Sequence, residues 1–400
     1  MKKILLLGGS AQQIVAIETA KRLGYYTVLC DYLEDNPGQY HADKFYLIST
    51  TDKEEVLRVA RSEKIDGILA YASDPAAPTA AYVAEKMNLP GNPYESVEIL
   101  CNKDKFRNFL NTHGFNAPTS MGYAQGDSIE NDLDKFNLPA IVKPVDSSGS
   151  KGVTVLKSWD RLPEAIDYAF RFSRCNRIII EEFIEKKHEY LIGGDIFIKD
   201  CKIVMWGLMN CHRDSRVNPL VPVGKSFPLL LSESDVKAIQ YVLQKIVTDL
   251  KLKVGSVNVE LVVDKEGRVW PIDIGPRAGG NMIPDLLGMI FNSDVVEMAV
   301  LAAMGEQIKS DGFIGKGFYA TSNLHALHNG VFECVKFSDT IEKHIIKSCL
   351  YKKKGDIIQY FDDASKAIGI VFMKFNSQEE MMEILKDINS HISIDVSNIQ

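Results

Sequence analysis

The sequence predicts a mixed α/β protein, with a parallel sheet first and α+β lobes after it. Three observations lead to this prediction. Short apolar runs alternate with amphipathic segments over the first ninety residues, a glycine-serine segment joins two strand-like runs near 150, and two strands with alternating apolar residues flank a turn near 265. At 400 residues, the chain is long enough for two or three domains.

The N-terminal segment alternates strand-like and helix-like runs. The strand-like runs are "KILLLGG", "YTVLCD" and "DGILAYASD", and the helix-like runs are "QQIVAIETAKRLG", "DKEEVLRVARSE" and "AAPTAAYVAEKMNLP". Strands that alternate with helices form parallel sheets with right-handed crossovers. We therefore predict a Rossmann-like domain over residues 1–95.

This domain also suggests an alternative function. Gly8 and Gly9 follow the first strand, and Asp31 ends the second at the spacing of an acid that binds a ribose. A nucleotide-cofactor oxidoreductase would use these residues. However, "GGSAQQ" lacks the later glycines of the dinucleotide fingerprint, and the plainer interpretation is a tight turn followed by a strand-end acid.

Two further units follow along the chain. The run "NKDKFRNFLNTHGFNAP" predicts a helix that ends near Gly114, and strands at "LPAIVKP", "GVTVLKS" and "RIIIEEFI" surround a helix from about 159 to 172. Next come a hairpin, "EYLIGGDIFIKDCKIVMWGLMN", with Lys199–Asp200 near its turn, and a long helix, "SDVKAIQYVLQKIVTDLKL". The last eighty or so residues alternate more strands and helices.

The hairpin near residue 265 carries two acids on one face. Apolar residues alternate from Val257 to Val263, which leaves Glu260 on the opposite face, and Asp273 faces the same way in the second strand. A two-residue turn at Lys265–Glu266 would place Asp273 opposite Asn258 and diagonal to Glu260. Hard carboxylate oxygens suit Mg²⁺, whereas the alternative is a solvated acidic face.

A lysine and a glycine-serine loop suggest a site for phosphate. Lys143 ends a strand, and the loop after it presents unhindered backbone N–H groups, which can cradle phosphate oxygens. The loop residues are Ser147, Ser148, Gly149, Ser150 and Gly152. The Walker pattern is absent because Gly152 leads into a strand, and an ordinary flexible turn is the alternative.

Composition limits the remaining possibilities. The net charge of −7 argues against a dedicated nucleic-acid binder. Seven cysteines show no Cys-x-x-Cys pair, so we expect neither a zinc site nor a disulfide framework. No apolar run approaches the roughly 20 residues of a membrane span. These features favour a cytoplasmic protein that binds neither nucleic acid nor membrane.

Several segments together resemble the ATP-grasp superfamily of carboxylate-amine ligases, closest to its carbamoyl-phosphate-synthase-like and amino-acid-ligase-like members. In family order they are "NKDK", "IVKPVDSSGSKGV", "IIIEEFIEKKHE" and "NVELVVDKEGRVWPIDIGPRAGGN". The resemblance implies an ATP-grasp fold preceded by the Rossmann-like domain. The small lobe with its connecting helix would span 96–184, the large lobe 185–310, and a C-terminal α/β appendage 311–400.

The resemblance also implies roles for individual residues. Lys105 and Lys143 would meet the ATP phosphates, and the loop from Ser147 to Gly152 would close over the terminal ones. Lys143 and Arg277 would act in catalysis, with Arg277 steadying the acyl phosphate or the acceptor. Magnesium would be held by Glu260 and Asp273. The hinge between the two lobes, where backbone groups would read the adenine edge, would be formed by Glu181, Glu182, Phe183 and Ile184. Glu189 would be the ribose-binding acid. Substrate contacts would come from Arg277 and Asn281, to which we add His212 and Arg213 from the polar stretch before "NPLVPVGKSFP".

Plainer interpretations remain for several of these positions. They are a surface lysine at Lys105, a buried strand at Phe183 and Ile184, a surface acid at Glu189, a salt-bridging arginine at Arg277, and an exposed loop at His212 and Arg213.

The chain also departs from the family pattern at two places. The family commonly has Glu-x-Asn-Pro-Arg where this chain has Asp273 and Gly275, so one carboxylate is shorter and an amide ligand is absent. Asn258, Asn281 or water could supply that oxygen. The tract "EKKHE" replaces a frequent glycine before Glu189.

The resemblance implies an ATP- and Mg²⁺-dependent, ADP-forming ligase. ATP would activate a substrate carboxylate as an acyl phosphate, which an amine would attack; the acceptor would be an amino acid, a peptide or a sugar acid. We expect two magnesium ions, for which Mn²⁺ could substitute, small-molecule acid and amine partners, and a homodimer as one oligomeric option. The alternatives are a bicarbonate-using carboxylase, the oxidoreductase described above and a non-catalytic ATP-binding module.

Overall fold

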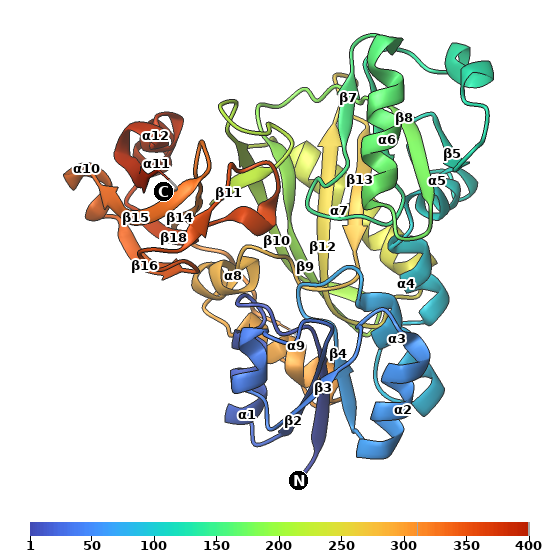
Figure 1. Cartoon of the computed structure of the whole chain (residues 1–400), viewed down its shortest axis with the longest axis vertical. Helices are drawn as coiled ribbons and strands as arrows, with labels where there is room; N and C mark the ends of the chain where they lie inside the picture. The colour runs from blue at the N-terminus through green and yellow to red at the C-terminus, as the bar shows by residue number, and fades with distance from the viewer. Residues whose placement is uncertain (310, 399–400) are drawn as a thin grey trace.

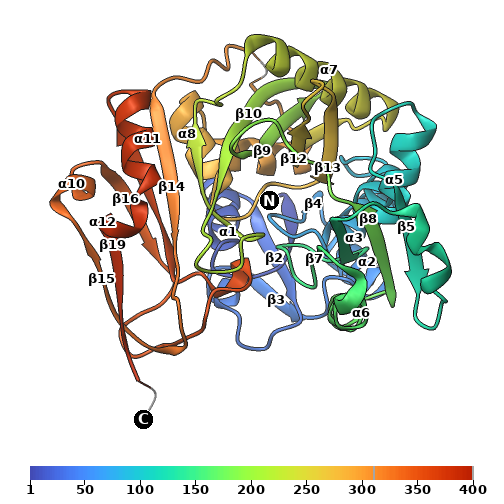
Figure 2. The same cartoon turned by 90° about the horizontal axis from the view of Figure 1, so that it is seen from above.

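A computed structural model describes residues 1–309 and 311–398 of the chain. The N-terminal domain lies below a large central sheet, the small lobe stands beside the upper part of one end of that sheet, and C-terminal strands form its other end (Figure 1). Figure 2 shows the small lobe and the C-terminal segment on opposite sides of the molecule. The predicted mixed α/β fold is confirmed.

The N-terminal domain is a four-stranded parallel sheet in the order β3-β2-β1-β4. Its strands are β1 (Lys3–Leu7), β2 (Tyr26–Asp31), β3 (Lys44–Leu47) and β4 (Gly67–Leu69), and its helices are η1 (Pro37–Tyr40), α1 (Ile14–Arg22), α2 (Lys53–Glu63) and α3 (Ala77–Met87). Helices cover both faces, so residues of β1 contribute to two separate cores. Strand β3 was not predicted, because no residue of this edge strand is fully buried.

A helical connector leads to the small lobe, which is an antiparallel sheet in the order β5-β8-β6-β7. The connector contains α4 (Tyr94–Leu100) and α5 (Lys103–Thr112). The lobe contains β5 (Ser120–Ala124), η2 (Glu130–Lys135), β6 (Ala140–Pro144), β7 (Thr154–Leu156), η3 (Trp159–Arg161), α6 (Leu162–Phe172) and β8 (Arg177–Glu182). The glycine-serine loop joins β6 to β7, as the sequence predicts.

The central sheet has eight antiparallel strands in the order β13-β12-β9-β10-β11-β14-β18-β16. Its first five strands along the chain are β9 (Leu191–Lys199), β10 (Lys202–Arg213), β11 (Pro222–Phe227), β12 (Val254–Val263) and β13 (Val269–Gly275). Helices α7 (Glu233–Asp249), α8 (Ile283–Phe291) and α9 (Val295–Ala303) pack on or beside it.

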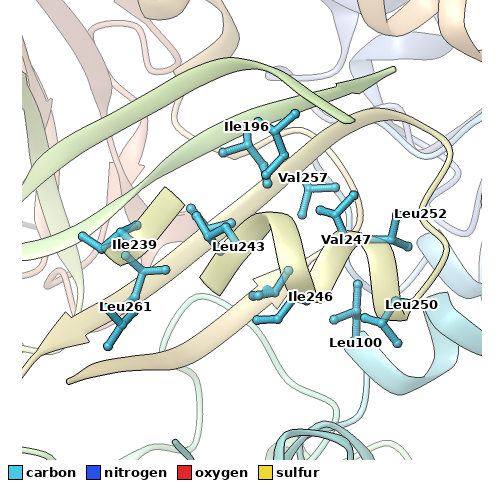
Figure 3. Close-up of a cluster of buried hydrophobic side chains, with 14 of the residues drawn as sticks. Leu100, Ile196, Ile239, Leu243, Ile246, Val247, Leu250, Leu252, Val257 and Leu261 are labelled. Atoms are coloured by element: carbon cyan, nitrogen blue, oxygen red, sulfur yellow. The ribbon is translucent and has the colours of Figure 1, made fainter. Parts of the chain in front are cut away.

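Helix α7 buries one face against the central sheet (Figure 3). Its buried residues are Ile239, Leu243, Ile246 and Val247, and this spacing places them on one stripe of the helix. They pack against Val257 and other buried residues of β9 and β12. Each such side chain contributes about 1.5–3 kcal/mol when fully buried, so this contact anchors the strands that carry the candidate site.

Three C-terminal strands extend the central sheet. They are β14 (Phe318–Leu324), β16 (Ile345–Leu350) and β18 (Gly369–Phe375). The remaining elements are β15 (Gly330–Phe337), α10 (Asp339–Glu342), β17 (Ile357–Ile358), η4 (Ala364–Lys366), α11 (Gln378–Lys386), α12 (Ile388–His391) and β19 (Ile392–Ser397). The predicted boundary at residue 310 falls outside the described residues. After it, β14, β16 and β18 continue the sheet of the large lobe, whereas β15, β17 and β19 form a separate sheet in the order β17-β15-β19.

The hairpin formed by β12 and β13 differs from the predicted one. Five residues, not two, separate the strands, because the Asp264 carboxylate accepts backbone N–H groups of Glu266 and Arg268 and the indole N–H of Trp270. A β-bulge after Glu260 then shifts the register. The predicted diagonal was therefore wrong: Asp273 lies directly opposite Glu260.

Within the described ranges, no single helix is long and apolar enough to cross a membrane. Helices α8 and α9 meet that criterion only when taken together, and they are bent by 113° relative to each other. Both helices contribute residues to buried clusters of the protein interior.

Candidate active site

Two facing carboxylates mark the centre of the candidate site. Glu260 and Asp273 are register partners on β12 and β13, and their side chains are 29% and 42% exposed. The nearest cations keep some distance: Arg213 Nη2 lies 3.7 Å from Glu260 Oε1, and Lys103 Nζ lies 3.7 Å from Asp273 Oδ2. Such a set of accessible carboxylate oxygens fits the ligand preference of Mg²⁺.

Lys103, and not Lys105, lies at this centre. Asn102 caps the start of α5, and the helix then turns the two lysines to different sides. Lys103 Nζ donates to the Ser147 carbonyl at 2.8 Å. Lys105 is half exposed and its Nζ donates to Glu98 Oε2 at 3.1 Å. The structure therefore places Lys103, rather than the predicted Lys105, beside Asp273, and a phosphate contact of either lysine stays a prediction.

Lys143 belongs to a buried ion triad. Its Nζ contacts a carboxylate oxygen of Glu181, and Arg107 Nε donates to the other oxygen at 3.0 Å. Arg107 also donates to the Ile272 carbonyl at 2.7 Å, so α5 connects β8 of the small lobe to β13 of the large lobe. The Glu181 side chain fixes the two cations, and the reading of adenine by backbone groups of this segment stays a prediction.

Burial and charge set the protonation of this triad. Burial lowers the pKa of Lys143 from 10.5 to about 8, although Glu181 acts in the opposite direction. Burial opposes ionisation of Glu181 too, but Arg107 and Lys143 together hold the pKa of that carboxyl at about 2. Near neutral pH the triad consists of one anion and two cations, with net positive charge.

The glycine-serine loop runs beside Lys103 and turns sharply. Gly149, Ser150 and Gly152 have positive φ values of 66°, 61° and 73°, a conformation that glycine adopts without strain. A Cβ atom on Gly152 would lie 2.8 Å from Pro144 Cγ. Glycine is thus required at 152 both for its φ angle and for space.

Arg277 is held in place by an acid of the N-terminal domain. Its guanidinium donates to both carboxylate oxygens of Asp74, from Nε at 2.7 Å, and its side chain is 12% exposed. Burial opposes ionisation of Asp74, and Arg277 more than offsets it, so the pKa of Asp74 lies below its usual value. Asn281 lies on the same loop, where its backbone N–H donates to Gln12 Oε1 at 2.7 Å.

A buried acid orders the strand next to Glu260. Asp195 is 2% exposed; its oxygens accept Asn258 Nδ2 and the Gly279 backbone N–H, each at 2.8 Å. Burial raises the pKa of Asp195. Asn258 is thus held by its amide nitrogen, two residues before Glu260 on the same face of β12.

The predicted adenine and ribose residues lie apart from these carboxylates. The Glu182 and Phe183 backbone N–H groups donate to Thr119 and Pro139 carbonyls, and Ile184 is partly exposed. Glu189 is exposed and lines a separate hollow of about 610 Å³ at the start of α7.

His212 and Arg213, at the end of β10, point in different directions. His212 Nε2 lies 2.8 Å from Ser226 Oγ, and its ring lies 4.6 Å from that of Tyr190. Burial, together with Lys225 and Arg213, lowers the pKa of His212 to about 4, so the ring is neutral near pH 7. Only Arg213 reaches the carboxylate pair.

One hollow of about 400 Å³ is lined by several of the site residues. Lys103, Ser147, Ser148 and Asp273 line it, and these residues come from the connector, the small lobe and the large lobe. Asp74 lines it as well and brings Arg277 to its edge. Groups suited to phosphate and to Mg²⁺ therefore face a common space.

Sequence reasoning missed Lys103, Arg107, Asp74 and Asp195. Lys103 stands within the quoted "NKDK" segment, and its place directly after the Asn102 cap was the available signal. Asp195 interrupts an apolar strand after two glycines, and an acid within an otherwise apolar strand indicates a buried carboxylate with specific hydrogen-bond partners. Arg107 and Asp74 gave no local signal, because their partners lie 74 and 203 residues away.

The acid of the alternative oxidoreductase site already makes hydrogen bonds within the protein. Asp31 Oδ2 accepts the Gly9 backbone N–H at 2.7 Å, and Oδ1 accepts the Leu33 N–H at 2.8 Å. The acid therefore closes its own turn, in agreement with the plainer interpretation.

Comparisons with known proteins agree with this fold. The model described as "ATP-grasp N-terminal domain" matches residues 17–91, and the "ATP-grasp domain" model matches residues 136–285. The structure aligns with an L-amino acid ligase from Bacillus licheniformis at a TM-score of 0.83 and 20% identity, over 100% of this chain and 99% of that one.

Two curated relatives share part of the sequence. A carbamoyl phosphate synthase large chain from Clostridium botulinum is 22% identical over 94% of this chain and 35% of its own length. A formate-dependent phosphoribosylglycinamide formyltransferase from Prochlorococcus marinus is 33% identical over 46% of this chain and 48% of its own length. The matches thus span half or less of these relatives. Taken with the two family matches and the shared fold, they establish that the chain belongs to the ATP-grasp superfamily.

Proposed function

We propose that the protein is an ATP- and Mg²⁺-dependent, ADP-forming ligase that activates a substrate carboxylate as an acyl phosphate and couples it to an amine. One observation carries the proposal: Lys103, the loop carbonyl of Ser147 and Asp273 share one hollow, with Glu260 directly opposite Asp273. Membership of the ATP-grasp superfamily supports ATP as the phosphoryl donor.

The chain's own residues would bind and orient the reactants. Lys103 and Lys143 would neutralise phosphate oxygens, and the Ser147–Gly152 loop would offer backbone N–H groups to the terminal phosphate. Arg277, fixed by Asp74, would hold the oxygen that carries developing negative charge. Such positioning and charge compensation supply most of the rate in phosphoryl transfer, without a nucleophilic Ser or Cys.

Glu260 and Asp273 would hold the magnesium, with the Asn258 amide oxygen as a further ligand. When bound, the metal would neutralise phosphate charge and polarise the phosphoryl group for attack. Two ions, and replacement by Mn²⁺, stay predictions that metal titration of the nucleotide complex would check.

The proposal also covers the class of substrate. We propose an amino acid, a peptide or a sugar acid as acceptor, with small-molecule acid and amine partners. A screen of acid and amine pairs with ATP and Mg²⁺ tests it: ADP formation that needs both partners, with the amide product identified by mass spectrometry, is the expected result. ADP formation with bicarbonate alone would indicate the carboxylase alternative instead.

The remaining alternatives have their own tests. Tight binding of ATP without turnover on any pair, unaffected by Glu260→Gln, would identify a binding module. Thermal stabilisation by NADH and none by ATP would favour an oxidoreductase, which the engaged carboxylate of Asp31 disfavours. The homodimer stays a prediction that light scattering of the purified protein would check.

A further inference from the structure

Lys225, on β11, is a buried cation without a salt-bridge partner among the described residues. Three Lys or Arg residues in the described ranges are buried: Arg107, Lys143 and Lys225, the last being 6% exposed. Arg107 and Lys143 share Glu181. Lys225, in contrast, has no carboxylate oxygen of the described chain within 4.0 Å.

The one side-chain partner of its ammonium among the described residues is a thiol. Lys225 Nζ lies 2.7 Å from Cys211 Sγ, and Cys211 is 1% exposed. A thiol is a weak acceptor, and Asp195, the buried acid that Lys225 influences, has no oxygen within 4.0 Å of this ammonium. Burying an unpaired charge is costly, so an ammonium here indicates an anion that binds beside it.

The ammonium points toward the candidate active site. Gly193 on β9 is the register partner of Glu260, and a Cβ on Gly193 would lie 3.0 Å from Lys225 Nζ and 2.7 Å from Cys211 Sγ. The missing side chain at 193 therefore makes the space that the ammonium fills. Lys225 reaches across β10 to the strand next to Glu260.

The order of strands separates two groups of cations. From one edge the sheet runs β13, β12, β9, β10, β11, which carry Asp273, Glu260, Gly193, Arg213 and Lys225 in turn. Lys103 lies at the edge of the sheet that carries Asp273, next to the glycine-serine loop. Arg213 lies at Glu260, and Lys225 lies beyond Gly193 on β11, three strands along the sheet from Glu260.

We propose that Lys225, together with Arg213, binds the carboxylate of the acid substrate on the Glu260 side of the site. The proposal rests on the proposed ligase function and adds a binding position to it. An acid held there would present its oxygen toward Glu260, while the nucleotide phosphates lie between Asp273 and the glycine-serine loop. The two negatively charged reactants would then have separate cations.

The test compares two lysine substitutions. Lys225→Met keeps the length of the side chain and removes its charge; Lys202→Met, at the exposed start of β10, is the matched control. We expect Lys225→Met to raise the KM for the acid roughly tenfold to a hundredfold, the range for loss of a charged hydrogen bond. Binding of a nonhydrolysable ATP analogue should stay unchanged, and the melting temperature should not fall, since the substitution removes a buried charge that has no ion-pair partner.

A second variant approaches the same position from the opposite strand. Gly193→Ala should displace the ammonium and raise the KM for the acid in the same direction, with Lys225 itself intact. An unchanged KM for the acid in Lys225→Met, or a loss of affinity for the ATP analogue instead, would overturn the assignment to the acid substrate.

A binding measurement separates this inference from the ligase function. With Mg²⁺ and ADP present, acetate, bicarbonate and inorganic phosphate are titrated while the melting temperature is followed. The expected result is stabilisation of the wild type and of Lys202→Met by acetate or bicarbonate, lost in Lys225→Met. No stabilisation of the wild type, stabilisation that Lys225→Met retains, or a loss confined to phosphate would each overturn it. Failure of the acid and amine screen would reject the proposed ligase function without altering this result.

Discussion

Lys103 Nζ donates to the backbone carbonyl of Ser147 at 2.8 Å, so the first turn of α5 is tied to the start of the glycine-serine loop. The contact links the connector to the small lobe at the hollow that also contains Asp273. Two residues further along, Lys105 turns away toward Glu98. Lys103 and Lys105 therefore allow the same side chain to be compared at two positions, one inside the candidate site and one outside it.

Lys103→Met should lower kcat/KM for ATP about a hundredfold or more, because a cation that faces the phosphates is lost. Lys105→Met is the matched control and should lie within about twofold of the wild type, since surface ion pairs contribute little. Steady-state ADP release checks both variants. The opposite ranking would restore Lys105 to the site and remove Lys103.

Glu260→Gln should abolish most Mg²⁺-dependent turnover, with a fall of about a hundredfold or more, because one of two facing carboxylates loses its charge. The folded state should keep its melting temperature, since the side chain is 29% exposed. Glu266→Gln, in the exposed turn of the same hairpin, serves as control. Full activity of Glu260→Gln at low Mg²⁺ concentration would exclude this residue as a metal ligand.

Glu181→Gln should destabilise the protein strongly. The substitution leaves Arg107 and Lys143 buried without a counter-charge, and breaking a buried ion pair costs about 3–5 kcal/mol. The denaturation midpoint in urea is the measurement. Glu233→Gln, whose side chain is 83% exposed in its pair with Lys237, should leave the midpoint unchanged; similar midpoints for both variants would contradict the role of the triad.

Affinity for ATP should fall as the pH rises through about 8. Burial lowers the pKa of Lys143 to about 8, so this ammonium loses its charge there and no longer attracts phosphate. Its effect on stability has the opposite sign: the folded chain releases this proton before the unfolded chain does, so this group favours folding increasingly between about pH 8 and its ordinary 10.5. Nucleotide titrations from pH 6.5 to 9.5 measure the first effect, and Lys143→Met should remove the step near pH 8. A step that persists in Lys143→Met would assign it to another group.

Gly152→Ala should impair the loop more than Gly149→Ala. Both positions have positive φ, but the added Cβ at 152 meets Pro144 at 2.8 Å, whereas at 149 the nearest neighbour, Ala364 Cβ, lies at 3.9 Å. The left-handed conformation alone costs roughly 1–2 kcal/mol for a non-glycine residue. The KM for ATP and the melting temperature of both variants check the ranking, and equal effects would show that space at 152 is irrelevant.

Local pattern was enough to predict much of the fold. Short apolar runs located β1 and β2, alternating apolar residues located β12, and a long helix-like segment located α7. The order of motifs along the chain identified the superfamily. All of these features depend on neighbours along the chain. Asp273 was predicted to lie opposite Asn258, two residues before its observed partner Glu260. The error arose because the loop length depends on the hydrogen bonds that the Asp264 carboxylate accepts from backbone N–H groups of the loop.

Long-range charge pairing could not be predicted in the same way. Nothing near Arg107 in the sequence shows that it meets Glu181, and nothing near Asp74 shows that it holds Arg277. These contacts form only when segments far apart in the sequence pack together. The choice between Lys103 and Lys105 likewise needed the helix start, which fixes the direction of each side chain.

The central claim is that nucleotide phosphates lie between the glycine-serine loop and the carboxylate pair through divalent ions. Anomalous scattering from Mn²⁺ in crystals grown with a nonhydrolysable ATP analogue tests it most directly. The expected result is a metal peak bonded to carboxylate oxygens of Glu260 and Asp273 and to phosphate oxygens, with Lys103 on the same phosphates. A metal or nucleotide bound elsewhere, with both carboxylates free, would contradict the claim.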